Sequence, residues 1–596
     1  MLKVPTSVGR PDQRAASGNL AMMRDDESPT SRWLPGLRLI RSYRRSWIRH
    51  DVYAGLAVTA VLIPAGMGYA VAAGLPPVNG LYATAVPLLV YAVVGPSRIL
   101  IFGPDSSLAP LIAATVLPLA GTDTARATSL AAALAVLVGV MSIAAGLARF
   151  GFLTDLLSIP VRYGYLSGIA LVIVLSQLAV MCGVSLTGDN LFEDVGSFVS
   201  AIRDGKLNQT SLALGLGALV AIVGLRRYAP KVPAALLAVV TGIAIVTAFD
   251  LDGIALVGEL PSGWPSFELP DVNGEEIAPL LAGAAGIAVV AMTDTSILSR
   301  SLALRGPSTV DANQELVAAG SVNAVSGLFQ GFPVSASASR TPVAAASGAK
   351  SQLTGVVGAV AVLVVLAWFP GLFRNLPSAV LAAVVISAAL SLIQVRALLR
   401  LARIRPGELA VSLVALAGIA VFGVIAGIGI AVAVSLLAFV RRAWAPHIAE
   451  LVRVDDMKGY HDVVRHPEGR RIPGIVLVRF DAPLFFANAE AFQRTILTLT
   501  DRRKGVRWIV VTAEPITDID TTGAQALSDV LDLLEERGIV LAFAELKGHV
   551  RDRLALTGIV DRIGTERFYP TIGEAVRAAV NATGADWTDW EERAGG

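Results

Sequence analysis

Residues 407–440 read GELAVSLVALAGIAVFGVIAGIGIAVAVSLLAFV and contain one charged side chain, Glu408. A single helix of this length would extend about 50 Å at 1.5 Å per residue, whereas the hydrocarbon core of a membrane is about 30 Å thick. The segment is therefore predicted to cross a membrane as two helices that fold back on each other. The predicted break lies at Gly423, Gly427 and Gly429.

The composition of the whole chain also indicates a polytopic membrane protein. Of its 596 residues, 54% are hydrophobic and 16% are charged, and the mean hydropathy is +0.64, whereas a soluble chain averages about 25% charged residues. These values exclude a soluble multidomain enzyme and a disordered or fibrous protein. The net charge of +2 argues against a nucleic-acid partner.

Cysteine and histidine usage predicts no metal site and no cofactor. Cys182 is the single cysteine, so an intrachain disulfide and zinc sites built on several cysteines are excluded. The five histidines are scattered and form no metal-binding spacing. The sequence also has no Walker A motif, which argues against an ATP-driven pump.

Charge density divides the chain into parts. Residues 1–50 are polar and arginine-rich, without the apolar core of a signal peptide, and are predicted to be a cytoplasmic N-terminal segment. Residues 51–442 form the predicted transmembrane transport domain. A linker is predicted at 443–472, and a small soluble domain with a C-terminal tail at 473–596.

Apolar runs predict fourteen membrane spans. Their ranges are 52–73, 78–94, 103–119, 126–148, 161–182, 210–225, 233–249, 277–298, 313–330, 336–349, 351–369, 377–394, 407–424 and 426–441. The spans at 103–119 and 336–349 are short and are interrupted by Gly, Pro and Ser. One is the third of the first seven spans and the other is the third of the second seven.

The placement of Lys and Arg predicts that both termini are cytoplasmic. Five arginines precede the first span, and further basic residues follow the sixth, twelfth and last spans. They are Arg38, Arg41, Arg44, Arg45 and Arg49, then Arg226, Arg227 and Lys231, then Arg396, Arg400, Arg403 and Arg405, and finally Arg441 and Arg442. The loop 250–276 has seven acids and no Lys or Arg, as an outer loop can. Ala/Gly/Arg-rich usage suggests a bacterial chain, and hence the cell inner membrane.

The two interrupted segments point to an anion site. They read FGPDSS at 102–107 and FPVSASASR at 332–340. Corresponding broken segments in two halves predict inverted repeats with a site at their interface, and the N-terminus of a half-helix favours an anion. The alternative is that the Gly, Pro and Ser residues are ordinary kinks. The predicted donors are the backbone N–H groups of Ser106, Ser107, Leu108, Ser337, Ala338 and Ser339.

Three charged residues lie close to these segments or deep in a span. Asp294 lies well inside the eighth span, where an ionisable residue is costly and usually functional. It could carry a proton or bind a cation; alternatively the span starts later and Asp294 is interfacial. Arg340 could offset the charge of an anion or be structural. Asp105 is interpreted as a helix N-cap or as a second titratable group.

Several motifs resemble those of the sulfate permease (SulP) family of anion transporters. The segments IPAGMGYA at 63–70 and AGLPPVNGLYA at 73–83 carry the resemblance. Further matches are NQE at 313–315, Gly320, Asn323, GFP at 331–333, SRT at 339–341 and GAKSQ at 348–352. The resemblance covers the chain from about Val52 to its end.

The resemblance implies a seven-plus-seven inverted repeat with core and gate domains, and a homodimer. The implied substrate site lies between the ends of the third and tenth helices, with first-helix residues such as Tyr69 lining it, and Asp294 matches the acidic position of the eighth helix. Two positions depart from the pattern. Ala65 replaces the Gln frequent in sulfate-type members, which weakens the sulfate assignment. Leu298 occupies the place of a sodium-associated hydroxyl, so proton coupling is favoured over sodium.

The C-terminal part is predicted to be an α/β domain. Strands are expected at 474–480, 507–512 and 539–543, with helices at 489–499 and 524–536. The loop TDIDTTGA at 517–524 resembles the Asp-Ser-Ser-Gly loop of STAS domains, which typically end SulP proteins. The resemblance makes Thr521 a possible regulatory phosphosite; alternatively, Asp520 and Thr521 simply cap the helix.

These observations together predict a secondary active anion transporter, not an enzyme. The expected activity is proton-coupled sulfate uptake (symport) by an elevator-like alternating-access mechanism. The expected partners are an inorganic anion, the proton and membrane lipid, with no nucleic acid. A bicarbonate or dicarboxylate transporter, and a passive anion channel or sensor, remain alternatives. An ionised Asp294 would repel an anion in a passive channel. A nucleobase–cation symporter is disfavoured because such proteins lack a STAS domain.

Overall fold

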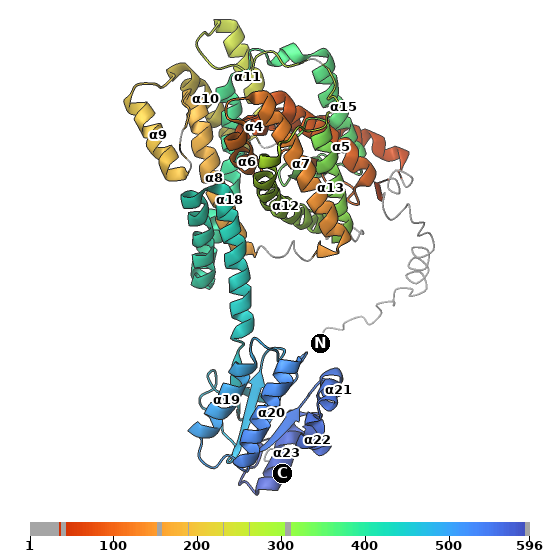
Figure 1. Ribbon diagram of the computed structural model, residues 1–596, viewed down its shortest axis with the longest axis vertical. Coiled ribbons are helices and arrows are strands. Elements are labelled where there is room, and N and C mark those ends of the chain that lie inside the picture. Colours follow the sequence, from red (N-terminus) through yellow and green to blue (C-terminus); the bar gives the residue numbers. More distant parts are fainter. Residues whose placement is uncertain are drawn as a thin grey trace, which may run out of the picture. The chain divides into compact units, whose positions relative to one another are not determined.

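The computed structural model describes residues 35–36, 43–151, 158–186, 188, 190–229, 232–261, 263–303 and 311–590. The chain forms two compact units, Met1–Ser435 and Leu436–Gly596, which are drawn in Figure 1. Most of the predicted N-terminal segment 1–50 and the tail 591–596 lie outside the described residues.

The first unit is helical, and a helix overlaps each of the predicted spans. The helices are α4 (Ile48–Ala72), α5 (Pro77–Val94), α6 (Ala109–Ala120), α7 (Thr124–Leu147), α8 (Ile159–Cys182), α9 (Leu191–Arg203), α10 (Gln209–Tyr228), α11 (Ala234–Phe249), α12 (Gly274–Ala303), α13 (Ala312–Leu328), α14 (Arg340–Ala346), α15 (Leu353–Trp368), α16 (Ser378–Ala389), α17 (Val395–Ile404) and α18 (Pro406–Trp444).

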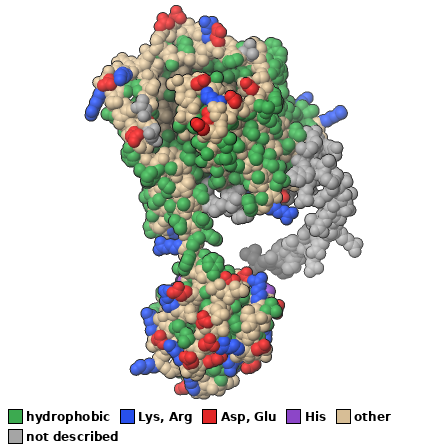
Figure 2. All heavy atoms as spheres, in the orientation of Figure 1, with side chains coloured by type: hydrophobic (Ala, Val, Ile, Leu, Met, Phe, Trp, Pro, Cys, Tyr) green, Lys and Arg blue, Asp and Glu red, His purple; other side chains and the backbone are tan. Residues whose placement is uncertain are grey.

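The length and composition of these helices identify a multi-pass membrane protein. Within the described residues, eight helices are long and apolar enough to cross a membrane, and three shorter helices are also apolar. Figure 2 shows hydrophobic side chains covering much of the visible face of this unit, whereas charged side chains are spread over the second unit. The count of fourteen crossings stays a prediction.

The segment 407–440 folds back as predicted. Helix α18 contains one non-helical residue, Gly423, with φ 80° and ψ 174°. A Cβ atom added at Gly427 would lie 2.5 Å from the Cα of Ile419, so the two halves of α18 pack directly on each other. The break therefore lies at Gly423, where positive φ favours glycine, and Gly427 instead permits the close approach.

Helices α7 and α13 form the most extensive helix pair of the first unit (Figure 1). A Cβ at Gly139 would lie 2.7 Å from the carbonyl oxygen of Gly320, and one at Gly327 would lie 2.4 Å from that of Ala132. Small residues allow such close packing of helices in a membrane. Helices α5 and α12 also pack on this pair, whereas α16 packs on α8, α10 and α4.

Two amphipathic helices were not predicted. Helix α9 lies in the predicted loop after the fifth span, and α17 lies between the twelfth and thirteenth. Each is too short and too polar to be recognised as a span, because a span is a continuous apolar run of about 20 residues. Their exposed apolar side chains are characteristic of helices that lie in the membrane interface.

The second unit is a three-layer α/β domain. Its sheet has the order β4-β3-β5-β6-β7-β8, in which β5 to β8 are parallel and β3 and β4 are antiparallel. The strands are β3 (Ile448–Arg453), β4 (Tyr460–Asp462), β5 (Ile475–Phe480), β6 (Trp508–Thr512), β7 (Val540–Ala544) and β8 (Phe568–Tyr569). The helices are α19 (Ala489–Arg502), α20 (Thr521–Glu536), α21 (Gly548–Leu556), α22 (Ile559–Ile563) and α23 (Ile572–Thr583).

Alternation along the strands explains the layers. Val476 and Val478 of β5 pack in the cluster formed with α19 to α22, whereas Ile475 and Leu477 pack in the cluster formed with α23. Successive side chains of a strand point to opposite faces, so one buried strand serves two cores. The three strands and two helices expected from sequence are present in this domain.

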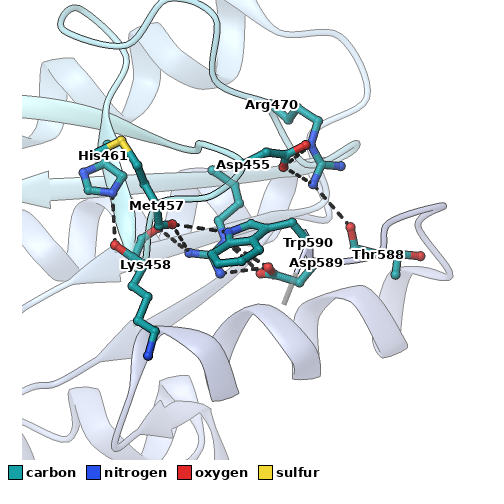
Figure 3. A network of polar contacts seen from close by, with 10 residues as sticks. Asp455, Met457, Lys458, His461, Arg470, Thr588, Asp589 and Trp590 are labelled. Atoms are coloured by element: carbon teal, nitrogen blue, oxygen red, sulfur yellow. Dashed lines mark hydrogen bonds and ion pairs between the residues drawn. The ribbon is translucent and has the colours of Figure 1, made fainter. Parts of the chain in front are cut away.

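The predicted linker 443–472 requires a correction, because it contains β3 and β4. Strand β3 pairs with β5, with Leu451 opposite Leu477. The C-terminal residues bind to the same region. Arg453 donates to Asp589 (Nη2 to Oδ1, 2.8 Å). Trp590, which lies beside Met457 in Figure 3, donates to the Met457 carbonyl at 3.3 Å. The α/β domain therefore begins before Pro473.

This correction predicts the behaviour of two truncations. A chain ending at Ile472 keeps β3 without its partner β5, so it exposes an unpaired apolar strand edge, which promotes aggregation. A chain ending at Trp444 removes the whole sheet and should stay monodisperse. Size-exclusion chromatography in detergent tests this; equal behaviour of the two forms would contradict the assigned boundary.

Candidate functional site

The two interrupted segments lie side by side. Strand β1 (Phe102–Gly103) pairs antiparallel with β2 (Ser335–Ala336), with Phe102 opposite Ala336. The Ser337 N–H continues this ladder by donating to the Ile101 carbonyl at 2.9 Å. The pairing holds the starts of α6 and α14 at one place in the first unit, as corresponding positions of two repeats would be.

Asp105 organises the turn that leads into α6. Its Oδ1 accepts hydrogen bonds from the Ser107 N–H (3.1 Å) and hydroxyl (3.0 Å), and its carbonyl accepts from the N–H groups of Leu108 and Ala109 at 3.2 Å. Its side chain thus caps the turn before α6, whereas the N-cap position itself is held by Leu108.

Arg340 is the first residue of α14 and is 1% exposed. Its Nη2 donates to the Pro104 carbonyl, while its Nε and Nη1 have no hydrogen-bond partner among the described residues. A Cβ added at Gly103 would lie 3.3 Å from Nη1, so the glycine leaves room for the guanidinium. Buried unpartnered donors are costly, which makes them candidates for binding an anion.

The source of positive charge near α14 differs from the expected one. Helix α14 has seven residues, and a macrodipole that sums over aligned peptides is small in so short a helix. The Arg340 guanidinium supplies a full charge at the same place.

The predicted backbone donors divide into two groups. The N–H groups of Ser107, Leu108 and Ser337 already bond within the protein. Those of Ser106, Ala338 and Ser339 have no such bond in the described structure. Ala338 and Ser339 are also exposed, whereas the residues on either side of them are buried.

Asp294 of α12 joins these elements. Its Oδ2 accepts a hydrogen bond from the Ser107 hydroxyl at 3.1 Å, and its Oδ1 forms an ion pair with Arg162 Nη2 of α8 at 2.9 Å. Its side chain is 13% exposed. Asp294 therefore contacts the start of α6 directly, rather than lying at a helix end away from the interrupted segments.

Tyr69 completes the group from α4. It is 5% exposed, and the side chains of Asp105, Arg340 and Ser106 are near its phenol. Tyr165 lies one turn after Arg162, and its buried hydroxyl has no hydrogen-bond partner in the described structure; the same holds for the Ser335 hydroxyl of β2. Unsatisfied polar groups are thus concentrated around the predicted anion site.

Arg162 was missed by the sequence analysis. It lies near the N-terminal end of a span, where an arginine is taken to mark the cytoplasmic side of the membrane. Only the fold shows that it faces a carboxylate on α12, 132 residues away in sequence. No composition or spacing rule could pair these two residues.

Glu315 was noticed only as part of a motif, although it is fully buried. Its Oε1 accepts from the Tyr91 hydroxyl at 2.5 Å, and its Oε2 accepts from the hydroxyls of Ser97 (3.0 Å) and Ser299 (2.9 Å). The carboxylate thereby links α13, α5 and α12. In the described part of the chain, the hydrogen bonds of the Glu315 carboxylate go to these three hydroxyls and none goes to the interrupted segments, so we interpret Glu315 as a structural residue.

Glu315→Ala is expected to destabilise the protein by about 3 kcal/mol or more, because three buried hydroxyls lose their acceptor. Tyr91→Phe leaves the carboxylate its two serine donors but also removes the acceptor of the Ser97 N–H, so its cost should be smaller, about 1–2 kcal/mol. Unfolding followed in detergent measures both. Equal stability of Glu315→Ala and the unmodified protein would contradict this network.

The C-terminal loop places Thr521 at the start of α20. Asp520 is the N-cap, and its Oδ1 accepts from the Gly523 N–H at 2.7 Å. The Thr521 side chain is exposed. The cap is therefore made by Asp520, and the Thr521 hydroxyl is accessible at the helix N-terminus.

Comparison with known proteins agrees with this architecture. The sequence profile described as Sulfate permease family matches residues 48–415. The chain belongs to the sulfate permease family. A second profile, the STAS domain, matches residues 466–575. This sulfate permease is accordingly a transporter with a C-terminal STAS domain, and not an enzyme.

Relatives and solved structures extend the comparison. A protein of Mycobacterium tuberculosis named as a probable sulfate transporter is 42% identical over 549 residues, which cover 92% of this chain and 98% of the relative. The chloroplastic sulfate transporter 4.1 of Arabidopsis thaliana is 30% identical over 565 residues, covering 92% and 82%. The inward-facing murine Solute Carrier 26 family member A9 has a similar fold, with a TM-score of 0.84, 22% identity and coverage of 97% and 100%.

Proposed function

We propose that this sulfate permease imports sulfate by secondary active transport coupled to protons. The observation that carries the proposal is the Asp294 carboxylate, which binds both Arg162 and the Ser107 hydroxyl beside the paired segments β1 and β2. The names of the relatives from Mycobacterium tuberculosis and Arabidopsis thaliana support sulfate as the substrate.

The proposed mechanism uses this ion pair as the coupling element. When ionised, Asp294 neutralises Arg162 and holds Ser107. A proton arriving from outside on an Asp294 oxygen breaks the ion pair, so the Arg162 guanidinium becomes available to an anion. Coulomb attraction between unit charges is strong where water is largely excluded, so proton and anion bind together.

Sulfate would then lie between the starts of α6 and α14. Its proposed donors are the N–H groups of Ser106, Ala338 and Ser339, assisted by the guanidinium of Arg340, with Tyr69 lining the site. Ser107, Leu108 and Ser337 shape the site through the bonds that their N–H groups make within the protein. Asp105 fixes the turn before α6 through its hydrogen bonds to Ser107. An elevator-like movement of a core domain against a gate domain releases both ligands inside.

The proposed membrane arrangement has fourteen spans in two inverted repeats of seven, with both termini cytoplasmic, in the cell inner membrane. The helices at each predicted span and the meeting of β1 with β2 support this arrangement. We also propose a homodimer, with Thr521 of the STAS domain as a regulatory phosphosite. A phosphate there would lie at the N-terminus of α20, which favours negative charge.

Uptake of labelled sulfate into proteoliposomes tests the function. An inward proton gradient should cause sulfate to accumulate above its external concentration, and sodium should not replace the proton. Unlabelled bicarbonate, nitrate and fumarate serve as competitors. Counterflow with one of these anions but not with sulfate would replace the substrate. Equilibration without accumulation would favour a passive channel instead.

A further inference from the structure

Helix α17 (Val395–Ile404) carries a stripe of arginines next to a stripe of exposed apolar residues. Its sequence is VRALLRLARI. Arg396, Arg400 and Arg403 recur at the spacing of one helical face. Val395 and Leu399 lie on the adjacent face and are 55% and 61% exposed. No residue of α17 is buried.

The three arginines lack acidic partners in the described part of the chain. Neither an ion pair nor a side-chain hydrogen bond joins Arg396, Arg400 or Arg403 to another described residue, whereas Arg405, just after the helix, pairs with Glu408 at 3.6 Å. Three positive charges therefore lie within eight residues of a helix placed between α16 and the membrane segment α18.

We propose that α17 is a binding surface for an anionic phospholipid. The arginine stripe matches the lipid phosphate, and the adjoining exposed apolar stripe matches the acyl region. An acidic soluble partner would neutralise the arginines but leave Val395 and Leu399 in water. The half-buried residues Leu398 and Leu401 stay directed towards the protein, where α17 packs on α8.

Helix α9 (Leu191–Arg203) provides a comparison within the same chain. It also exposes an apolar stripe, with Phe192 65%, Val195 44% and Val199 40% exposed. Its first turn, however, carries Glu193 and Asp194, and its one basic residue is Arg203. Helix α9 is therefore amphipathic like an interfacial helix but has no cationic face. We expect it to bind anionic and neutral phospholipids equally well.

Titration of the purified full-length protein with dioleoylphosphatidylglycerol or dioleoylphosphatidylcholine tests the proposal. The unmodified protein should bind more phosphatidylglycerol, counted by native mass spectrometry, and unfold at a higher temperature in its presence. The variant Arg396→Gln/Arg400→Gln/Arg403→Gln should bind it at least tenfold more weakly, since each basic residue near an anionic surface contributes appreciably. High salt should weaken the same preference in the unmodified protein.

The matched control is Lys458→Gln/Lys504→Gln/Arg577→Gln, which removes the same charge from exposed positions of the second unit. It should keep the full preference for phosphatidylglycerol. Equal loss in both triple variants, no preference in the unmodified protein, or competition by inorganic phosphate at equal concentration would each overturn the proposal. So would an altered oligomeric state of the α17 variant with unchanged lipid binding, because a second copy would then cover this face.

A site-specific probe separates α17 from the rest of the surface. Because Cys182 is the single cysteine, Cys182→Ser allows one fluorophore to be attached at Leu399→Cys or, for comparison, at Val199→Cys. Phosphatidylglycerol in nanodiscs should shift the emission at position 399 to the blue relative to phosphatidylcholine and leave position 199 unchanged. Equal shifts at both positions would contradict a binding surface on α17.

Discussion

Asp294→Asn is expected to abolish proton-driven accumulation of sulfate and to remove the pH dependence of uptake. Asparagine has nearly the same size as aspartate and can still accept a hydrogen bond from the Ser107 hydroxyl. Its amide, however, cannot take up or release a proton at the pH values of an uptake assay. It also leaves the Arg162 guanidinium without its carboxylate at 2.9 Å. The variant should bind sulfate at all pH values, because Arg162 is permanently available.

Uptake and exchange must be measured separately for this variant. Exchange of internal for external sulfate needs no net proton movement, so it should persist in Asp294→Asn while uphill uptake is lost. Arg162→Gln is the matched change on the other side of the pair and should weaken sulfate binding instead. Accumulation by Asp294→Asn with an unchanged pH profile would show that Asp294 does not couple the proton.

Arg340→Gln is expected to weaken sulfate binding by roughly 10- to 100-fold, the range that corresponds to losing a hydrogen bond to a charged group. In the structure Arg340 is 1% exposed, and its Nη2 donates a hydrogen bond to the Pro104 carbonyl. Its Nε and Nη1 have no hydrogen-bond partner among the described residues. Sulfate accepts hydrogen bonds from a planar fork better than from a single ammonium. Arg340→Lys should therefore lie between Gln and the native residue.

Stability distinguishes the binding role of Arg340 from a structural one. Removing a buried guanidinium with two unpartnered nitrogens should leave the unfolding temperature unchanged or raise it, even though its hydrogen bond to the Pro104 carbonyl is lost. Removing a structural charge would lower it. Isothermal titration with sulfate and unfolding with and without sulfate give both quantities. A large fall in stability with an unchanged sulfate-induced shift would assign Arg340 to the scaffold.

Sequence patterns predicted the elements of this protein better than their contacts. Apolar runs located helices at each predicted span, because a helix in a membrane must be apolar over most of its length. Short apolar runs rich in β-branched residues predicted β5, β6 and β7 of the STAS domain. Helices α9 and α17 were missed because they are amphipathic, and β3 and β4 because their strand signals are weak beside a charged stretch.

The site shows the same division. Asp294 and Arg340 could be selected from sequence because a charge inside an apolar segment is costly wherever it finally lies. The sequence also predicted that the two interrupted segments share one site, because each is the third predicted span of its seven-span half. The sequence could not predict which backbone N–H groups remain free for an anion. The N–H groups of Ser107 and Ser337 bond to Asp105 and Ile101 only in the folded structure.

The sequence by itself determined that this protein is a multi-pass membrane transporter of the sulfate permease family with a STAS domain, because composition and local motifs are properties of the chain. Only the tertiary structure decided which charges meet. Arg162 and Asp294 are 132 residues apart and lie on different helices. Glu315 and Tyr91 also lie on different helices, 224 residues apart. Their pairing depends on how helices pack, and helices pack on small residues such as Gly139 and Gly320, which carry no charge information.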